Sequence, residues 1–189
     1  MQHINEARLL DRIHALGRTG LDAAGRRVRL AATDEDKAGR DLLAQWMTEA
    51  GLTVVTDCVG NQFGIWQTEE NKDREPVMLG SHIDSVINAG QYDGCTGVLG
   101  GLEVIQTLME SGAKPARPLA VGAFTDEEGV RFAPDMLGSL VYVGGLDVDM
   151  ALDTVGVDGK RLGDELRRIG YAGTAGPLFI RPHAFVELH

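Results

Sequence analysis

Histidine and acidic side chains stand at the ends of predicted strands in this sequence. His82 and Asp84 close a predicted strand that begins with the apolar run 77–79. Residues i and i+2 of a strand point to the same face, so the two side chains can reach one site. A carboxylate often holds the second ring nitrogen of a metal-binding histidine. The pair therefore predicts a metal-binding imidazole, and the alternative is a strand with polar residues at its mouth.

Asp93 lies in a turn rich in glycine, shortly before a helical pattern. Gly90, Gly94 and Gly97 surround it in the sequence. Glycine allows the backbone to bend closely around a bound group. The turn therefore predicts that the Asp93 carboxylate is presented to a ligand.

Three consecutive acids, Asp126, Glu127 and Glu128, follow an apolar stretch that is typical of a strand buried on both faces. A surface loop tolerates their repulsion, whereas a buried site accepts it only against a cation. Adjacent strand residues point in opposite directions, so two of these acids can share a site only where the strand ends. One carboxylate could then bind a metal while its neighbour takes a proton from water. An acidic surface loop is the alternative interpretation.

Four side chains together supply the nitrogen and oxygen ligands that zinc or manganese accepts. Each stands at a strand end or in a glycine turn, and the combination is more specific than any member. The predicted metal ligands are His82, Asp93, Glu128 and His189.

The apolar periodicity predicts which elements hold these residues. Strands that alternate with long helices indicate an α/β fold with a largely parallel sheet, whose ligands bind at the carboxyl ends of the strands. Arg26, Arg27 and Arg29 are interpreted as a solvated basic face. Segment 136–143 is either a short helix or rich in turns. Helices are predicted at residues 4–16, 34–50, 97–111, 148–152 and 159–169, and strands at 52–59, 62–67, 76–80, 118–125 and 184–189.

The composition limits the class of protein. A chain of 189 residues with 43% hydrophobic residues can form one domain with a sizeable core. Its net charge of −10, without a basic block, argues against nucleic-acid and anionic membrane partners. Cys58 and Cys95 are interpreted as free thiols of a reducing compartment. With no signal peptide or long apolar run, a soluble cytoplasmic protein is expected.

The sequence resembles a known enzyme family. This is the hydantoinase/carbamoylase-type amidohydrolase branch of the dinuclear-zinc aminopeptidase-like family, which includes N-carbamoyl-L-amino-acid hydrolases, β-ureidopropionases and allantoate amidohydrolases. The acidic run before Arg131 and the Tyr-Asp-Gly turn favour this branch over related peptidases. The matching motifs are GSHIDS (80–85), GQYDG (90–94), FTDEEGVRF (124–132), MLGS (136–139) and FVELH (185–189).

The resemblance implies an α/β fold, a three-layer zinc-aminopeptidase-like catalytic domain with a mixed, largely parallel sheet. It also implies two divalent metal ions, Zn²⁺ or Mn²⁺, bridged by Asp93. His82 would bind the first ion, with Asp84 orienting its ring. Glu128 and His189 would bind the second ion, and Glu127 would be the general base. The substrate would be a small N-carbamoyl or ureido acid.

Family members are roughly twice as long as this chain. We therefore expect residues 1–189 to be the N-terminal part of the catalytic domain, truncated before the lid or dimerisation domain and the C-terminal catalytic part. The full-length protein would be a homodimer, and the isolated chain is expected to be inactive. Two alternatives stay open, a dinuclear-zinc aminopeptidase or deacylase of the same fold, and an inert fragment that binds metal or a partner.

Overall fold

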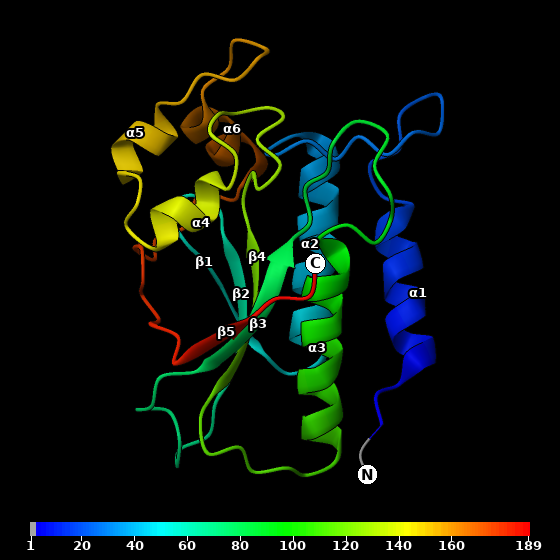
Figure 1. The fold of residues 1–189 in the computed structure, drawn as a ribbon, viewed down its shortest axis with the longest axis vertical. Coiled ribbons are helices and arrows are strands. Elements are labelled where there is room, and N and C mark those ends of the chain that lie inside the picture. The colour runs from blue at the N-terminus through cyan, green and yellow to red at the C-terminus, as the bar shows by residue number, and fades with distance from the viewer. Residues whose placement is uncertain (1–2) are drawn as a thin grey trace.

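A five-stranded mixed sheet forms the centre of the computed structural model, which describes residues 3–189 (Figure 1). The spatial order of the strands is β1-β2-β4-β3-β5. β3 pairs in parallel with both β4 and β5, whereas β1 with β2 and β2 with β4 are antiparallel. The expected mixed α/β sheet is confirmed, with its parallel pairing confined to three strands. The strands are β1 Thr53–Thr56, β2 Gln62–Trp66, β3 Val77–His82, β4 Leu119–Phe124 and β5 Ala184–Val186.

Helices cover both faces of this sheet. α1, α2 and α3 lie on one side, and α4, α5 and α6 lie on the other side towards one end of the strands (Figure 1). Segment 136–143, for which the sequence left two readings open, contains the short helix α4. The helices are α1 Glu6–Gly17, α2 Asp34–Glu49, α3 Cys95–Glu110, α4 Leu137–Tyr142, α5 Val148–Leu152 and α6 Leu162–Ile169. None of the helices in residues 3–189 is long and apolar enough to cross a membrane.

β4 separates two apolar clusters because its side chains alternate between the faces of the sheet. Val121 and Ala123 pack with α1, α2 and α3, while Ala120 and Phe124 pack with Tyr142 of α4. All six residues of this strand are buried. The three layers and the strand buried on both faces are thus as predicted.

Two strands, β1 and β5, are at least three residues shorter than the sequence predicts. β1 ends at Thr56 because the chain turns there, and the Asp57 carboxylate accepts the backbone N–H groups of Val59 and Asn61. β5 ends at Val186, since its pairing with β3 stops at Leu79.

The predicted solvated basic face is wrong for Arg29. Arg26 is exposed and Arg27 is half-buried, but Arg29 has no exposed surface. The backbone between α1 and α2 folds inward, so that the Arg29 guanidinium reaches buried carbonyl groups. Composition could not indicate this, because the three arginines look alike in the sequence.

A buried amide links the β1–β2 turn to the end of β4. The Asn61 side chain donates to the Asp57 carboxylate and to the Gly138 carbonyl, and it accepts the Thr125 N–H. Thr125 begins the acidic segment after β4, so this network fixes where that segment leaves the sheet. Burial raises the pKa of Asp57 from 3.8 to about 6.

We predict that Asp57→Asn changes how stability depends on pH. A raised pKa in the folded state means that the native protein binds the extra proton between about pH 4 and pH 6. Wild-type stability should therefore fall relative to the variant by about 2 kcal/mol as the pH rises from 4 to 7. Urea unfolding across this range measures the difference, and Asp73→Asn controls for the loss of one surface charge. A difference that stays constant with pH would contradict the prediction.

Candidate metal centre

The carboxyl ends of the three parallel strands lie at one edge of the sheet and carry the predicted site residues. β3 ends at His82, which is paired in register with Phe124 at the end of β4. The acidic segment follows directly after Phe124. β5 runs parallel to β3 on its other side and leads to His189. Parallel pairing therefore gathers residues that are more than a hundred positions apart in the chain.

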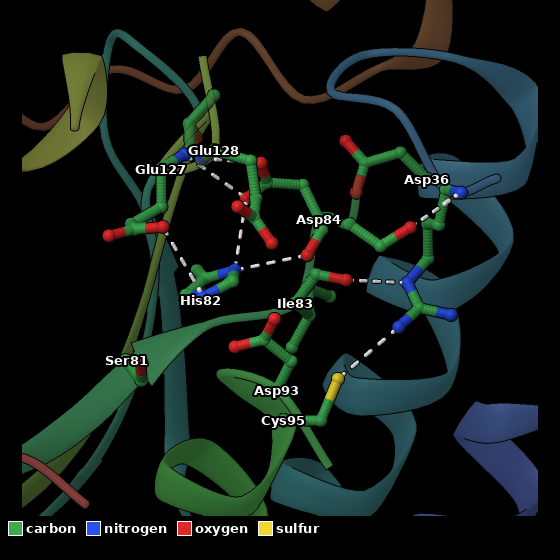
Figure 2. A network of polar contacts seen from close by, with 12 residues as sticks. Asp36, Ser81, His82, Ile83, Asp84, Asp93, Cys95, Glu127 and Glu128 are labelled. Carbon is green, nitrogen blue, oxygen red and sulfur yellow. Dashed lines mark hydrogen bonds and ion pairs between the residues drawn. The ribbon is translucent and has the colours of Figure 1, made fainter. Parts of the chain in front are cut away.

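The His82 ring is completely buried and is held through one nitrogen. Its Nδ1 lies 3.0 Å from the backbone oxygen of Asp84 and 3.7 Å from the Asp84 carboxylate (Figure 2). A carbonyl oxygen can only accept, so this hydrogen bond requires a proton on Nδ1. In the neutral ring the lone pair is then on Nε2, the nitrogen that faces Glu127 at 3.4 Å. His82 is thus oriented as a metal ligand.

The hydrogen bond to the His82 ring is made by the Asp84 backbone oxygen, and the Asp84 carboxylate makes other contacts that the sequence did not indicate. Because β3 ends at His82, the Asp84 side chain turns toward the segment after β4 and accepts the backbone N–H groups of Glu127 and Glu128, each at 3.2 Å. Burial raises the pKa of Asp84 to about 6, and the nearby Asp36 carboxylate adds to the rise. Asp84 therefore connects the histidine segment to the two acids.

Glu127 and Glu128 stand in a tight turn after β4. The turn has left-handed backbone at Asp126, with φ of 53°, and at Gly129, with φ of 63°. The Met136 N–H donates to the Glu127 carbonyl and closes the turn. Burial raises the pKa of Glu128, and the Asp93 and Glu127 carboxylates raise it further. A cation among these groups would relieve that repulsion.

Asp126, between the strand and these two glutamates, is a feature that sequence reasoning missed. Its side chain is buried, and neither carboxylate oxygen has a hydrogen-bond partner within residues 3–189. Burial, followed by the charge of Asp84, raises the pKa of Asp126 to about 8. A raised pKa favours the protonated, uncharged form of this carboxyl group, and that form lowers the negative charge behind the centre.

Gly94 brings Asp93 against the histidine. Its φ is +60°, and a Cβ atom there would overlap the ring of His82. α3 begins at the next residue, Cys95, without a side-chain cap. Asp93 Oδ1 also lies 3.1 Å from Nε2 of His189. The glycine is therefore required both by the turn and by the close contact with the ring.

His189 approaches from the segment after β5. Ser81 donates to the Glu187 carboxylate at 2.6 Å, which holds this segment beside β3. The rings of His82 and His189 lie 5.3 Å apart between centroids. His189 is exposed, in contrast to His82.

Two sets of three side chains could each hold a metal ion. One set is His82, Asp93 and Glu128, and the other is His82, Glu127 and His189; within each set the ligand atoms lie within 4.8 Å of one another. The buried atoms His82 Nε2 and Glu128 Oε1 have no hydrogen-bond partner within residues 3–189. Nitrogen and oxygen donors in this arrangement fit zinc or manganese. Glu128 and His189 fall in different sets, although the resemblance places them on the same ion. The assignment of ligands to individual ions therefore stays a prediction.

Comparison with protein families shows the family to which the chain belongs. The model of peptidase family M28 matches residues 61–158, just over half of the chain, and this range includes His82, Asp93, Glu127 and Glu128. The chain belongs to peptidase family M28. Within this family it groups with the hydantoinase/carbamoylase-type amidohydrolases, as the resemblance led us to expect.

Three known proteins illustrate the similarity. The chain is 38% identical over 188 residues to an N-carbamoyl-L-amino-acid amidohydrolase of Rhizobium meliloti, covering 100% of this chain and 45% of that protein. It is 40% identical over 170 residues to a ureidoglycolate hydrolase of Arabidopsis thaliana, covering 85% and 36%. A hydantoinase/carbamoylase family amidase from Burkholderia ambifaria matches with a TM-score of 0.95 and 42% identity, covering 100% and 46%. The chain thus spans about half the length of the relatives it matches.

We predict that Gly94→Ala disrupts the centre of this M28 chain. A left-handed backbone costs a residue with a side chain about 1–2 kcal/mol, and the overlap with the His82 ring adds to this cost. Stability should fall by at least that amount, and the affinity for Zn²⁺ should fall with it. Urea unfolding and zinc titration measure both effects. Gly90→Ala is the matched control, since a Cβ there meets nothing within 4 Å; an equal response of both variants would contradict the prediction.

Proposed function

We propose that residues 1–189 form the N-terminal part of the metal-dependent catalytic domain of an amidohydrolase. Its substrates would be N-carbamoyl-L-amino acids or related ureido acids such as allantoate, in which it hydrolyses a linear C–N bond. One observation carries the proposal. Among residues 3–189 the buried Nε2 of His82 has no hydrogen-bond partner, and it faces the acids of two other segments, in a chain similar to enzymes named for such substrates.

The proposed centre holds two divalent ions, Zn²⁺ or Mn²⁺. Asp93 would contact both, His82 would bind one, and Glu128 with His189 would bind the other. Bound divalent ions supply Lewis acidity toward a carbonyl oxygen and toward water. The orientation of the His82 ring and the crowded carboxylates favour this assignment, because a cation offsets both the burial and the repulsion that raise the pKa of Glu128.

Glu127 is the proposed general base. Its carboxylate is half-buried at the mouth of the centre, 3.4 Å from His82 Nε2. There it could accept a proton from the attacking water and deliver it to the departing nitrogen. Asp84 orients the base by accepting the Glu127 backbone N–H. Water attacks the ureido carbonyl, the C–N bond breaks, and the carbamoyl group leaves as carbon dioxide and ammonia.

The proposal includes a cytoplasmic homodimer that acts on a small molecule, without nucleic-acid or membrane partners. The net charge of −10 argues against nucleic-acid and anionic membrane partners, and the two free cysteines favour a reducing compartment.

Ammonia release by the full-length protein tests the proposed reaction. The protein, loaded with Zn²⁺ or Mn²⁺, is supplied with N-carbamoyl-L-amino acids, with allantoate and with a dipeptide. We expect ammonia from at least one carbamoyl or ureido acid and no cleavage of the dipeptide. Dipeptide cleavage without ammonia release would instead favour the aminopeptidase alternative.

We predict that Asp93→Ala removes both metal ions from the full-length protein, because both would share this carboxylate. Elemental analysis of the purified variant measures the metal content. Asp73→Ala, in the charged loop before β3, is the control and should keep the wild-type content. Retention of two ions per chain by Asp93→Ala would rule out the bridging role.

We predict that the two neighbouring glutamates respond differently to the same substitution. In the full-length protein, Glu127→Gln should keep its metal but lose turnover on the order of 10²–10⁴-fold, the usual contribution of a general base. Glu128→Gln should weaken metal binding. Metal analysis and kcat of the two variants separate base from ligand, and each variant controls for the other. Near-normal turnover of Glu127→Gln would exclude the base role.

A further inference from the structure

Arg29 is a buried cation whose hydrogen bonds go to neutral groups. It has no exposed surface, and its guanidinium donates to three backbone oxygens and one sulfur. Within residues 3–189 no carboxylate accepts a hydrogen bond from it, whereas the buried Arg40 pairs with Asp36 and the buried Arg131 pairs with Glu165. The acceptors of the Arg29 guanidinium are Ile83 O at 2.6 Å, Thr19 O at 2.8 Å, Leu16 O at 3.0 Å and Cys95 Sγ at 3.3 Å.

A buried cation without a carboxylate partner is costly for a fold. The Leu16 carbonyl belongs to the last turn of α1, where the helix dipole is negative, and this offsets part of the cost. An apolar side chain could fill the same space without a buried charge. The placement of Arg29 is therefore better explained by what its donors hold in position.

The donors of Arg29 reach two of the segments that carry candidate metal ligands, those of His82 and Asp93. Ile83 lies between His82 and Asp84, so its carbonyl belongs to the histidine segment. Cys95 is the first residue of α3 and follows Asp93 by two positions. Figure 2 shows the Ile83 carbonyl and the Cys95 sulfur facing the same guanidinium group.

The backbone of Arg29 extends this connection along the histidine segment. Its N–H donates to the Ser85 hydroxyl at 3.0 Å, and its carbonyl accepts the Ser85 N–H at 2.9 Å. The stretch 83–85 is therefore held at both ends by one residue. A single side chain and its backbone thus brace the loop that carries His82 against the start of α3.

We propose that Arg29 is a positioning residue of the metal centre. It sets the separation of His82 from Asp93 by holding the Ile83 carbonyl and the Cys95 sulfur on one rigid guanidinium. The ligands are then arranged before a metal arrives. This inference rests on the proposed metal site and adds to it a residue that contacts neither metal nor substrate.

Cobalt(II) titration of the full-length protein, followed by visible absorption, tests the role without any assay of activity. Cys95→Ala removes the hydrogen-bond acceptor at the start of α3. Residues that hold metal ligands in place without binding the metal typically contribute about 10–100-fold to metal affinity. We expect a loss of that size together with a changed absorption spectrum. Cys95→Ser keeps a polar acceptor and should recover part of the affinity. Cys58→Ala makes the same change at the other free cysteine, outside the centre, and should bind as wild type does.

Arg29→Lys provides a second arm, since an ammonium cannot span the acceptors that the planar guanidinium holds. It should show the same loss of affinity and the same spectral change as Cys95→Ala. Circular dichroism reports whether the Arg29→Lys variant folds. If it does not fold, the results for Cys95→Ala and Cys95→Ser alone test the positioning role.

Two results would overturn the inference, and they differ. If wild type binds cobalt and Cys95→Ala matches Cys58→Ala in affinity and spectrum, the positioning role is wrong while the metal site stands. If wild type binds no cobalt at all, the metal site and the positioning role both fail.

Discussion

Parallel pairing of β3 with β4 and β5 is the constraint on which the rest of the structure depends. It places the ends of three strands at one edge, with His82 opposite Phe124 and Leu79 opposite Val186. Every candidate ligand leaves the sheet from this edge or from the turn that begins α3. A slip of one residue in β3 would turn the imidazole to the other face of the sheet. The apolar clusters on both faces therefore fix the register and, through it, the chemistry.

The edge of the sheet concentrates negative charge that the fold itself does not neutralise. Burial raises the pKa of Asp84 to about 6 and that of Asp126 to about 8, and it also raises the pKa of Glu128. Protons relieve part of this repulsion, and the backbone N–H groups on Asp84 relieve another part. What remains is an acidic cluster around the free nitrogen of His82, a combination that is costly for stability and suited to a divalent cation.

Sequence periodicity predicted the elements because burial imposes it directly. The continuous apolar run of β4 and the apolar stripe of α3 are read from residue types alone, and the polar residues that follow β3 and β4 mark where those two strands end. The residues at those ends were therefore also predictable as a group. The Asp84 carboxylate was expected to hold the His82 ring. In the structure the Asp84 backbone oxygen makes the hydrogen bond to the ring, and the carboxylate holds the backbone of the two glutamates through a contact across the sheet.

Arg29 and Asp126 could not be interpreted from sequence for a different reason. Arg29 resembles its exposed neighbour Arg26, and only the fold of the loop between α1 and α2 decides which of them is buried. Asp126 looks like one of three equivalent acids until the turn after β4 directs it inward. The local sequence pattern therefore predicts well whether a segment is a helix or a strand. Whether a polar residue in a loop is buried depends instead on contacts with segments far away in the chain.

The tautomer of His82 tests the central claim most directly. Two-dimensional ¹H–¹⁵N NMR of the imidazole nitrogens can be recorded on this chain before and after addition of Zn²⁺. The account predicts a proton on Nδ1 in both states, held by the Asp84 carbonyl, and a large change in the Nε2 shift when zinc is added. A proton on Nε2 that persists in the presence of zinc would contradict it.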